Sequence, residues 1–133
     1  MAKMIWKSEA DIKSEKFKET FDRKIAELKA ACTNAIYEGF TSVATGFNFG
    51  FNQHDQENFT QQMLLIVASN GNYTDQIRWK TKEGTVEPLT VSKFISLTNE
   101  AAVHKTTQQD KYWVLEQQVL KATTVEEIEA VIW

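Results

Sequence analysis

Apolar residues recur at helical spacing over the first quarter of the chain. Successive members are four, three, four and three positions apart, which is the spacing of an a/d seam. Lysine and glutamate fill the other faces, and Gly39 follows where a left-handed residue commonly ends a helix. The pattern therefore predicts one amphipathic helix over residues 9–38. The seam consists of Phe21, Ile25, Leu28, Cys32 and Ala35.

The seam covers little more than two heptads, which is short for an independent coiled coil. This length favours a helix that packs on its own domain, and leaves open a helix that docks on a partner or on a second copy. Residues 1–8 alternate apolar and polar positions only briefly, so they form either an edge strand or a loose arm.

Strict alternation follows over residues 41–52, with Phe47, Phe49 and Phe51 on one face. The opposite face is small and contains Gly46 and Gly50. The alternation predicts a continuous central strand whose aromatic face is covered by helices. Glycine weakens a strand unless something approaches closely, so we expect a bulky side chain or a neighbouring chain over the glycine face.

A middle helix and a hairpin are predicted next. Asp55 is the expected N-cap of a helix that runs to about Ser69, with Phe59 and Ile66 on its apolar stripe. Alternating residues within 73–90, with a turn at residues 82–85, predict a hairpin. Pro88 cannot donate to a ladder, so the returning strand should lie at an edge or end early.

The last third of the chain reads as helical. Thr90 or Ser92 can cap a helix that extends to about Lys121, although its polar middle at residues 105–110 either crosses solvent or breaks the helix. Thr124 and Glu127 have capping-box spacing before a short final helix. The apolar chain end suggests a docked terminus. The predicted fold is a single α+β domain over residues 1–133. A small antiparallel sheet packs with a long N-terminal helix, a middle helix and a long C-terminal helical region.

Composition excludes several classes of protein but does not by itself indicate a function. The 133 residues are 42% hydrophobic, which is enough for a core. The formal net charge of -3 predicts no nucleic-acid partner. One cysteine excludes an internal disulfide, and the N-terminus lacks a secretory apolar region. The longest apolar run, residues 63–68, is too short to span a bilayer. We therefore expect a soluble protein made in the cytoplasm, with no membrane partner.

Candidate chemistry is sparse. His54 lies in a predicted helix start and His104 in a polar helical stretch, and neither has metal-ligand spacing to a second donor. Cys32 occupies the seam, where it acts as a small hydrophobe. Glu126 and Glu127 fall in the first turn of the last helix, where carboxylates favour the helix dipole. We predict no catalytic residue, no metal and no cofactor.

Four tryptophans in this length raise a different possibility. Core packing is the first interpretation, partner anchoring the second, and stacking on sugars the third. Trp79 between Lys80 and Lys82 gives only a weak basic and aromatic cluster. The candidate partner interface combines seam residues with two tryptophans: Phe21, Ile25, Leu28, Trp79 and Trp133.

The order of several weak features resembles a known family. The series comprises Cys32 and Ile36 on a helix, Gly39-Phe40, Gly46, Asp55-Gln56 with Asn58, Trp79-x4-Gly84, His104, and Ala122-Thr123-Thr124 with Glu127, Ile128 and Trp133. It resembles a family of uncharacterised domains of tailed bacteriophages and prophages, usually encoded among tail, tail-fibre and fibre-assembly genes. The resemblance covers roughly residues 20–133.

The resemblance implies a non-enzymatic component of a phage tail or a phage-tail-like bacteriocin. It would bind a receptor-binding or tail-fibre protein, as an assembly chaperone or a retained accessory subunit, and homo-oligomers are compatible with it. The expected location is the host cytoplasm during assembly, with retention in the virion tail as the other outcome. A glycan-binding module at the tail tip is the alternative, favoured if Trp79 and Tyr73 are exposed and co-planar. The family has no established catalytic residues to transfer.

Overall fold

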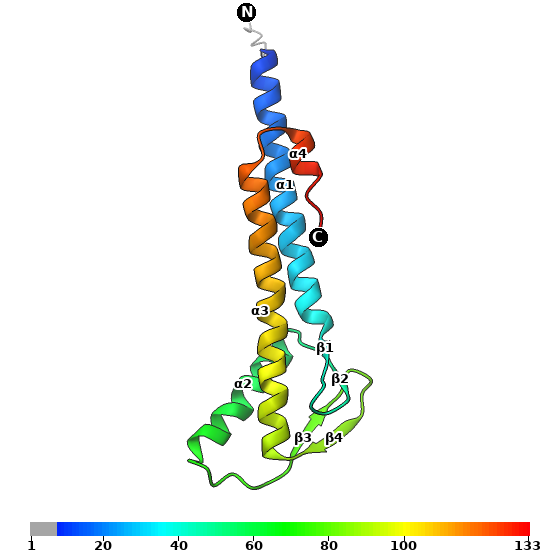
Figure 1. Ribbon diagram of the computed structural model, residues 1–133, viewed down its shortest axis with the longest axis vertical. Coiled ribbons are helices and arrows are strands. Elements are labelled where there is room, and N and C mark those ends of the chain that lie inside the picture. Colours follow the sequence, from blue (N-terminus) through cyan, green and yellow to red (C-terminus); the bar gives the residue numbers. More distant parts are fainter. Residues whose placement is uncertain (1–7) are drawn as a thin grey trace, which may run out of the picture. The chain divides into compact units, whose positions relative to one another are not determined.

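The computed structural model describes residues 8–133, which fall into two compact units (Figure 1). Unit 1 combines the residues up to Cys32 with Asp110–Trp133, and unit 2 is Thr33–Gln109. Two helices, α1 (Glu9–Glu38) and α3 (Val91–Lys121), contribute to both units. The predicted α+β fold is confirmed. The predicted arm at residues 1–8 lies outside the described residues, apart from Ser8.

α1 begins and ends where its sequence signals lie. The Asp11 amide donates to Ser8 Oγ at 3.1 Å, and the Ser8 amide donates to the Asp11 carboxylate at 3.4 Å. This reciprocal pair is a capping box. At the other end Gly39 has φ +89°, and its N–H donates to Ile36 O at 3.2 Å. The helix predicted over residues 9–38 is therefore confirmed at both ends.

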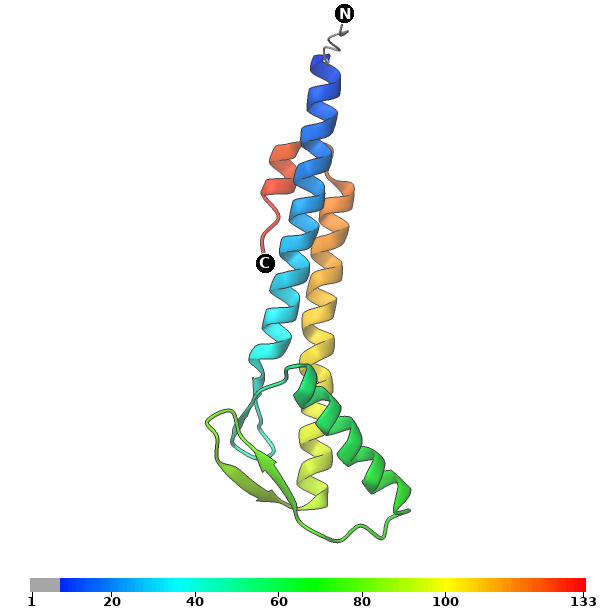
Figure 2. The ribbon, with the colours of Figure 1, turned by 180° about the vertical axis from the view of Figure 1, so that it is seen from behind.

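Unit 1 is helical. In Figures 1 and 2 its parts of α1 and α3 lie side by side, and α4 (Val125–Glu129) returns against α1. Ile128 and Val119 are fully buried. Arg23 forms an ion pair with Glu129, which attaches α4 to α1. The predicted cap holds, because the Glu127 amide donates to Thr124 Oγ1 at 3.1 Å.

The predicted central strand at residues 41–52 is wrong. The segment is a tight hairpin of β1 (Phe40–Thr41) and β2 (Asn48–Phe49), with Phe40 opposite Phe49. Gly46 has φ +80° and lies in the turn, with no atom near it to cover a strand face. Gly50 likewise meets only the Asp55 carboxylate within 4 Å. These glycines therefore serve the chain path, and the expected bulky cover is absent among the described residues.

A residue far along the chain holds this turn in place. Glu100 of α3 accepts from Ser42 Oγ at 2.7 Å and from the Val43 amide at 2.6 Å. The carboxylate satisfies backbone donors that a strand partner would otherwise have taken. Phe49 and Phe51 are buried below the turn, whereas Phe47 is exposed.

The second hairpin follows its prediction. β3 (Ile77–Lys80) pairs antiparallel with β4 (Val86–Leu89), with Ile77 opposite Leu89. Residues 8–133 contain two two-stranded sheets where one sheet was expected. One backbone hydrogen bond joins them, from the Lys82 amide to Asn48 O at 2.8 Å.

The middle helix, α2 (Gln53–Ala68), starts one turn before the predicted cap. Asn52 is the N-cap, and Asp55 is the third helical residue that completes the capping box. The core of unit 2 is aromatic. The ring centre of Phe59 lies 4.9 Å from that of Trp79 and 5.7 Å from that of Phe94. α3 continues unbroken through its polar middle, which decides between the two alternatives of a continuous and a broken helix. Figure 2 shows α2 and both hairpins around the first half of α3.

Candidate partner-binding surface

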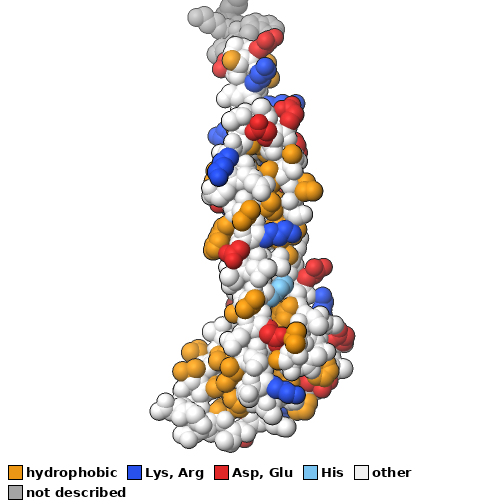
Figure 3. All heavy atoms as spheres, in the orientation of Figure 1, with side chains coloured by type: hydrophobic (Ala, Val, Ile, Leu, Met, Phe, Trp, Pro, Cys, Tyr) orange, Lys and Arg blue, Asp and Glu red, His pale blue; other side chains and the backbone are white. Residues whose placement is uncertain are grey.

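The second half of α2 is apolar on more than one face. Phe59 and Ile66 are buried seven residues apart and fix the helix on unit 2. Leu64, Leu65 and Val67 are 62%, 57% and 68% exposed. The sequence has no charged residue between positions 58 and 74 to surround them. Hydrophobic side chains accordingly gather over α2 in the space-filling view (Figure 3). Exposed apolar surface of this kind marks interaction sites.

A groove of about 390 Å³ lies between α2 and α3. Leu64, Val67 and the half-buried Met63 line it from α2. α3 contributes small side chains, including Thr98, Ala101 and Ala102, so the two helices leave room between them. Lys105 also lines the groove, and its ammonium donates to Gln56 Oε1 at 2.7 Å. The groove therefore has apolar walls and a single cation.

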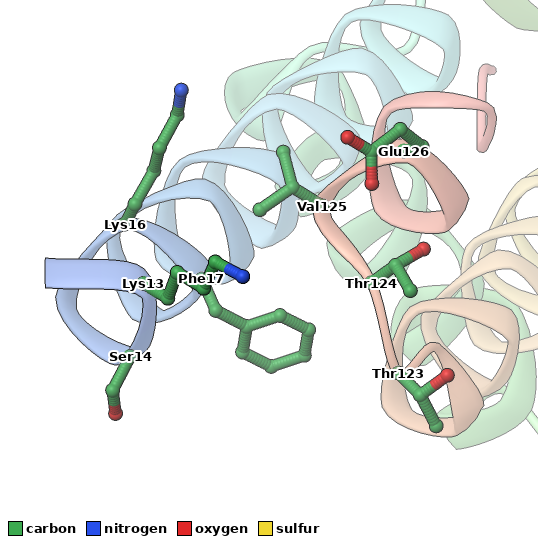
Figure 4. Close-up of a pocket in the computed structure, with 8 residues that line it drawn as sticks. All are labelled: Lys13, Ser14, Lys16, Phe17, Thr123, Thr124, Val125 and Glu126. Carbon is green, nitrogen blue, oxygen red and sulfur yellow. The ribbon is translucent and has the colours of Figure 1, made fainter. Parts of the chain in front are cut away.

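A larger hollow, of about 510 Å³, lies in unit 1 between α1 and the turn before α4. Figure 4 shows the Phe17 ring directed from α1 toward that turn, while Lys16 points away. The turn's polar groups are already used, because Thr123 and Thr124 bond with Glu127. The hollow thus has an apolar side chain at its centre and lacks a constellation for chemistry among its lining residues.

The predicted interface residues fall in different environments. Leu28 is only 2% exposed, so it belongs to the core of unit 1 and offers no surface in this conformation. Phe21 and Ile25 are half-buried beside it. Trp133 is half-buried as well, with the Lys111 ammonium 4.3 Å from its ring centre.

Trp79 contributes to the core of unit 2. Its ring centre lies 4.9 Å from that of Phe59 and 4.8 Å from that of Phe94. These two aromatic neighbours cover part of the Trp79 ring, so less of its face is available to stack on a sugar. This packing counts against the glycan-binding alternative, which needed an exposed Trp79.

Residues considered for chemistry have structural surroundings. His104 Nε2 lies 3.1 Å from Ile36 O, and its ring centre lies 5.5 Å from that of Phe40. His54 is exposed in the first turn of α2. Cys32 is buried, and this burial raises the pKa of its thiol, which disfavours the nucleophilic thiolate. Within residues 8–133, no three His, Cys, Asp or Glu side chains cluster closely enough to hold a metal ion.

Tyr112 is a described residue whose pKa lies well above its usual value. Burial, together with the hydrogen bond from its hydroxyl to Glu116 Oε2 at 2.6 Å, raises the pKa of Tyr112 to about 12. The neutral phenol of Tyr112, which donates to the Glu116 carboxylate, therefore stabilises unit 1.

Sequence reasoning missed the exposed face of α2. The sequence pattern predicts an apolar stripe that includes Phe59 and Ile66, but it does not indicate a second, exposed apolar face. The available signal was the unbroken apolar run from Met63 to Ala68. Such a run passes all round a helix, so part of it must face solvent unless neighbours surround the helix.

The fold and the surface define a small α+β protein that exposes an uncharged apolar helix face. The chain belongs to the family described as Domain of unknown function (DUF4376), whose sequence model matches residues 19–132. No curated protein and no solved structure gives a significant match to the chain. Among the described helices, none is both long enough and apolar enough to cross a membrane.

Proposed function

We propose that this protein is a non-enzymatic component of a phage tail or phage-tail-like bacteriocin. Its role is to bind a receptor-binding or tail-fibre protein, as an assembly chaperone or a retained accessory subunit. The tail context comes from the family resemblance of the sequence. The binding role is supported by one structural observation, the exposed and uncharged apolar face of α2 with its groove.

The α2 face suits a protein partner for energetic reasons. Covering a large aliphatic side chain contributes about 1.5–3 kcal/mol when it is fully buried. Leu64 and Val67 lie beside the groove, so one partner element could cover both side chains and fill the space between α2 and α3. The groove's small α3 residues would let a partner side chain enter deeply.

The residues with reactive side chains support a non-enzymatic role. The Cys32 thiol is buried, and His104 is engaged by a backbone carbonyl and an aromatic ring. Burial withholds the Cys32 thiol from a substrate, and the contacts of His104 fix its ring against Ile36 and Phe40.

Co-expression with the tail-fibre protein of the same genome tests the proposal. Size-exclusion chromatography and a pull-down should show a complex. If the fibre protein is soluble, trimeric and infective without this chain, and no complex forms, the proposal fails.

A matched pair of variants then tests the surface. Leu64→Gln with Val67→Gln should weaken the complex at least tenfold, since fully burying one large aliphatic side chain contributes about 1.5–3 kcal/mol. Val103→Gln removes an apolar side chain that is equally exposed on α3 but does not line the groove, and should leave affinity unchanged. Circular dichroism and thermal unfolding establish that both variants fold. Equal affinities for the two variants would exclude α2 as the binding face.

A further inference from the structure

The register of the β3–β4 hairpin determines which backbone groups face outward. The Thr81 amide donates to Thr85 O at 2.7 Å, which makes that pair hydrogen-bonded. Hydrogen-bonded and non-hydrogen-bonded pairs alternate along an antiparallel ladder. Trp79–Glu87 is therefore hydrogen-bonded, and Arg78–Pro88 and Lys80–Val86 are not. The N–H and C=O groups of Arg78 and Lys80 thus point away from β4.

The bond to the neighbouring hairpin supports this assignment. Lys82 lies two positions after Lys80, so its amide should also point away from β4. That amide donates to Asn48 O of the neighbouring hairpin. Beyond this single bond, no described strand pairs with the outer edge of β3. The edge is thus open from Arg78 to Lys80.

The outer edge of β4 is different. Pro88 occupies an outward-facing position on β4, and proline has no N–H to offer there. The hairpin therefore has one edge interrupted by proline and one edge with intact donors and acceptors.

A hollow of about 360 Å³ lies beside the intact edge, between β3 and α2. The exposed Leu65 and the half-buried Gln62 line it from α2, and Arg78, Trp79 and Lys80 line it from β3. The Gln62 Nε2 atom is buried and has no hydrogen-bond partner among the described residues. A buried amide donor without an acceptor is costly.

The charges beside this hollow favour acidic residues. Arg78 and Lys80 alternate with Trp79, so both cations lie on the face of the strand opposite the aromatic core. Neither cation forms an ion pair with a described residue. The one carboxylate in the lining, Asp55, already accepts from the Asn52 amide at 3.0 Å.

We infer that the outer edge of β3 takes up an extended segment of a partner protein as an added strand, held between β3 and α2. Main-chain bonds to Arg78 and Lys80 align the segment, and its side chains alternate between the two faces. Acidic residues lie beside Arg78 and Lys80, and apolar residues lie beside Trp79 and Leu65. The inference rests on the proposed partner-binding function and names the recognition chemistry: alternating acidic and apolar residues.

Amide hydrogen exchange by NMR tests the added strand directly. In the free protein the Arg78 and Lys80 amides should exchange faster than the Trp79 amide, which bonds to β4. On forming the complex with the tail-fibre protein, the Arg78 and Lys80 amides should slow at least tenfold. A complex that leaves both amides unprotected overturns the inference, while the proposed function stands.

A second experiment, with a synthetic peptide, tests the inference even if no fibre complex forms. The probe is acetyl-Gly-Glu-Val-Glu-Val-Glu-Gly-amide, and the control peptide carries lysine in place of each glutamate. The acidic peptide should slow exchange at Arg78 and Lys80 and bind at least tenfold more tightly than the control. Absence of binding at millimolar peptide, together with absence of a fibre complex, overturns both the inference and the proposed function.

Variants separate recognition from folding. Arg78→Glu with Lys80→Glu should abolish acidic-peptide binding and favour the lysine peptide. Lys93→Glu, an exposed cation at the start of α3, should change neither affinity. Unchanged peptide preference in a folded double variant would show that the edge does not select by charge. Light scattering on the same samples reports whether a second copy, rather than the peptide, occupies the edge.

Discussion

Gly39 joins α1 to β1 and tolerates no side chain. A Cβ atom added at this glycine would lie 1.8 Å from Phe49 O and 2.7 Å from Gly50 Cα. Both contacts are with backbone, so a rotamer change cannot relieve them. Gly39 also has φ +89°, a conformation that side chains disfavour. Gly39→Ala therefore combines a conformational penalty with a backbone clash.

Both penalties can be given a magnitude. An alanine in the left-handed region costs about 1–2 kcal/mol. Relieving the clash requires β1 to separate from β2, which breaks the Phe40–Phe49 pairing, and each lost hydrogen bond costs about 0.5–1.5 kcal/mol net. The Phe40–Phe49 pair is a hydrogen-bonded pair with two such bonds, so the total is about 2–5 kcal/mol. Because whole domains are stable by only about 5–15 kcal/mol, the variant should be close to unfolding.

Gly71→Ala is the matched control. Gly71 has φ +87°, so it imposes the same conformational penalty, but no described atom lies within 4 Å of its added Cβ. Urea unfolding followed by tryptophan fluorescence should show a loss of about 1–2 kcal/mol for Gly71→Ala and at least about 1 kcal/mol more for Gly39→Ala. Equal losses within about 0.5 kcal/mol would refute the close approach of Gly39 to β2.

Three further predictions concern helix α1, the cap of α2 and the pH response. Leu28→Asp should cost at least about 3 kcal/mol in urea unfolding because it buries a charge, whereas Ile12→Asp on the exposed part of α1 should cost under about 0.5 kcal/mol. Asn52→Ala should cost about 1 kcal/mol of thermal stability by removing the capping box. Between pH 10 and 12 the unfolded chain loses the Tyr112 proton first. Wild-type stability should therefore fall by up to about 1.4 kcal/mol per pH unit more than that of Tyr112→Phe.

The helices were predictable because their signals are local. The seam of α1 predicted the helix and Gly39 predicted its C-terminal end, and the alternation around Trp79 with the turn at residues 82–85 predicted the second hairpin. The local pattern does not determine whether α3 is continuous, because a polar stretch is compatible both with a helix that crosses solvent and with a helix that breaks. The cap of α2 was misplaced by one turn because Asn52 and Asp55 are both good caps, and only the reciprocal bonds distinguish them.

The first hairpin was not predictable because its turn is held by a distant residue. Alternating residues at 41–52 fit a strand, and only the positive φ of Gly46 and the bonds to Glu100 reverse the chain. A carboxylate 58 positions from Ser42 leaves no mark in the local pattern. The candidate surface was missed for a similar reason: whether Leu64 is buried depends on which elements surround α2.

The two cations on β3 also bear on why an open edge can persist in solution. An unpaired strand invites pairing with a second copy, and charged side chains are one means of preventing it. Two copies joined edge to edge along β3 would bring Arg78 and Lys80 near their own counterparts, and like charges on neighbouring strands repel. An acidic segment would instead be attracted by the same two cations. The side chains that oppose self-pairing at β3 are thus the ones that would admit the partner, while Pro88 leaves β4 incomplete for either.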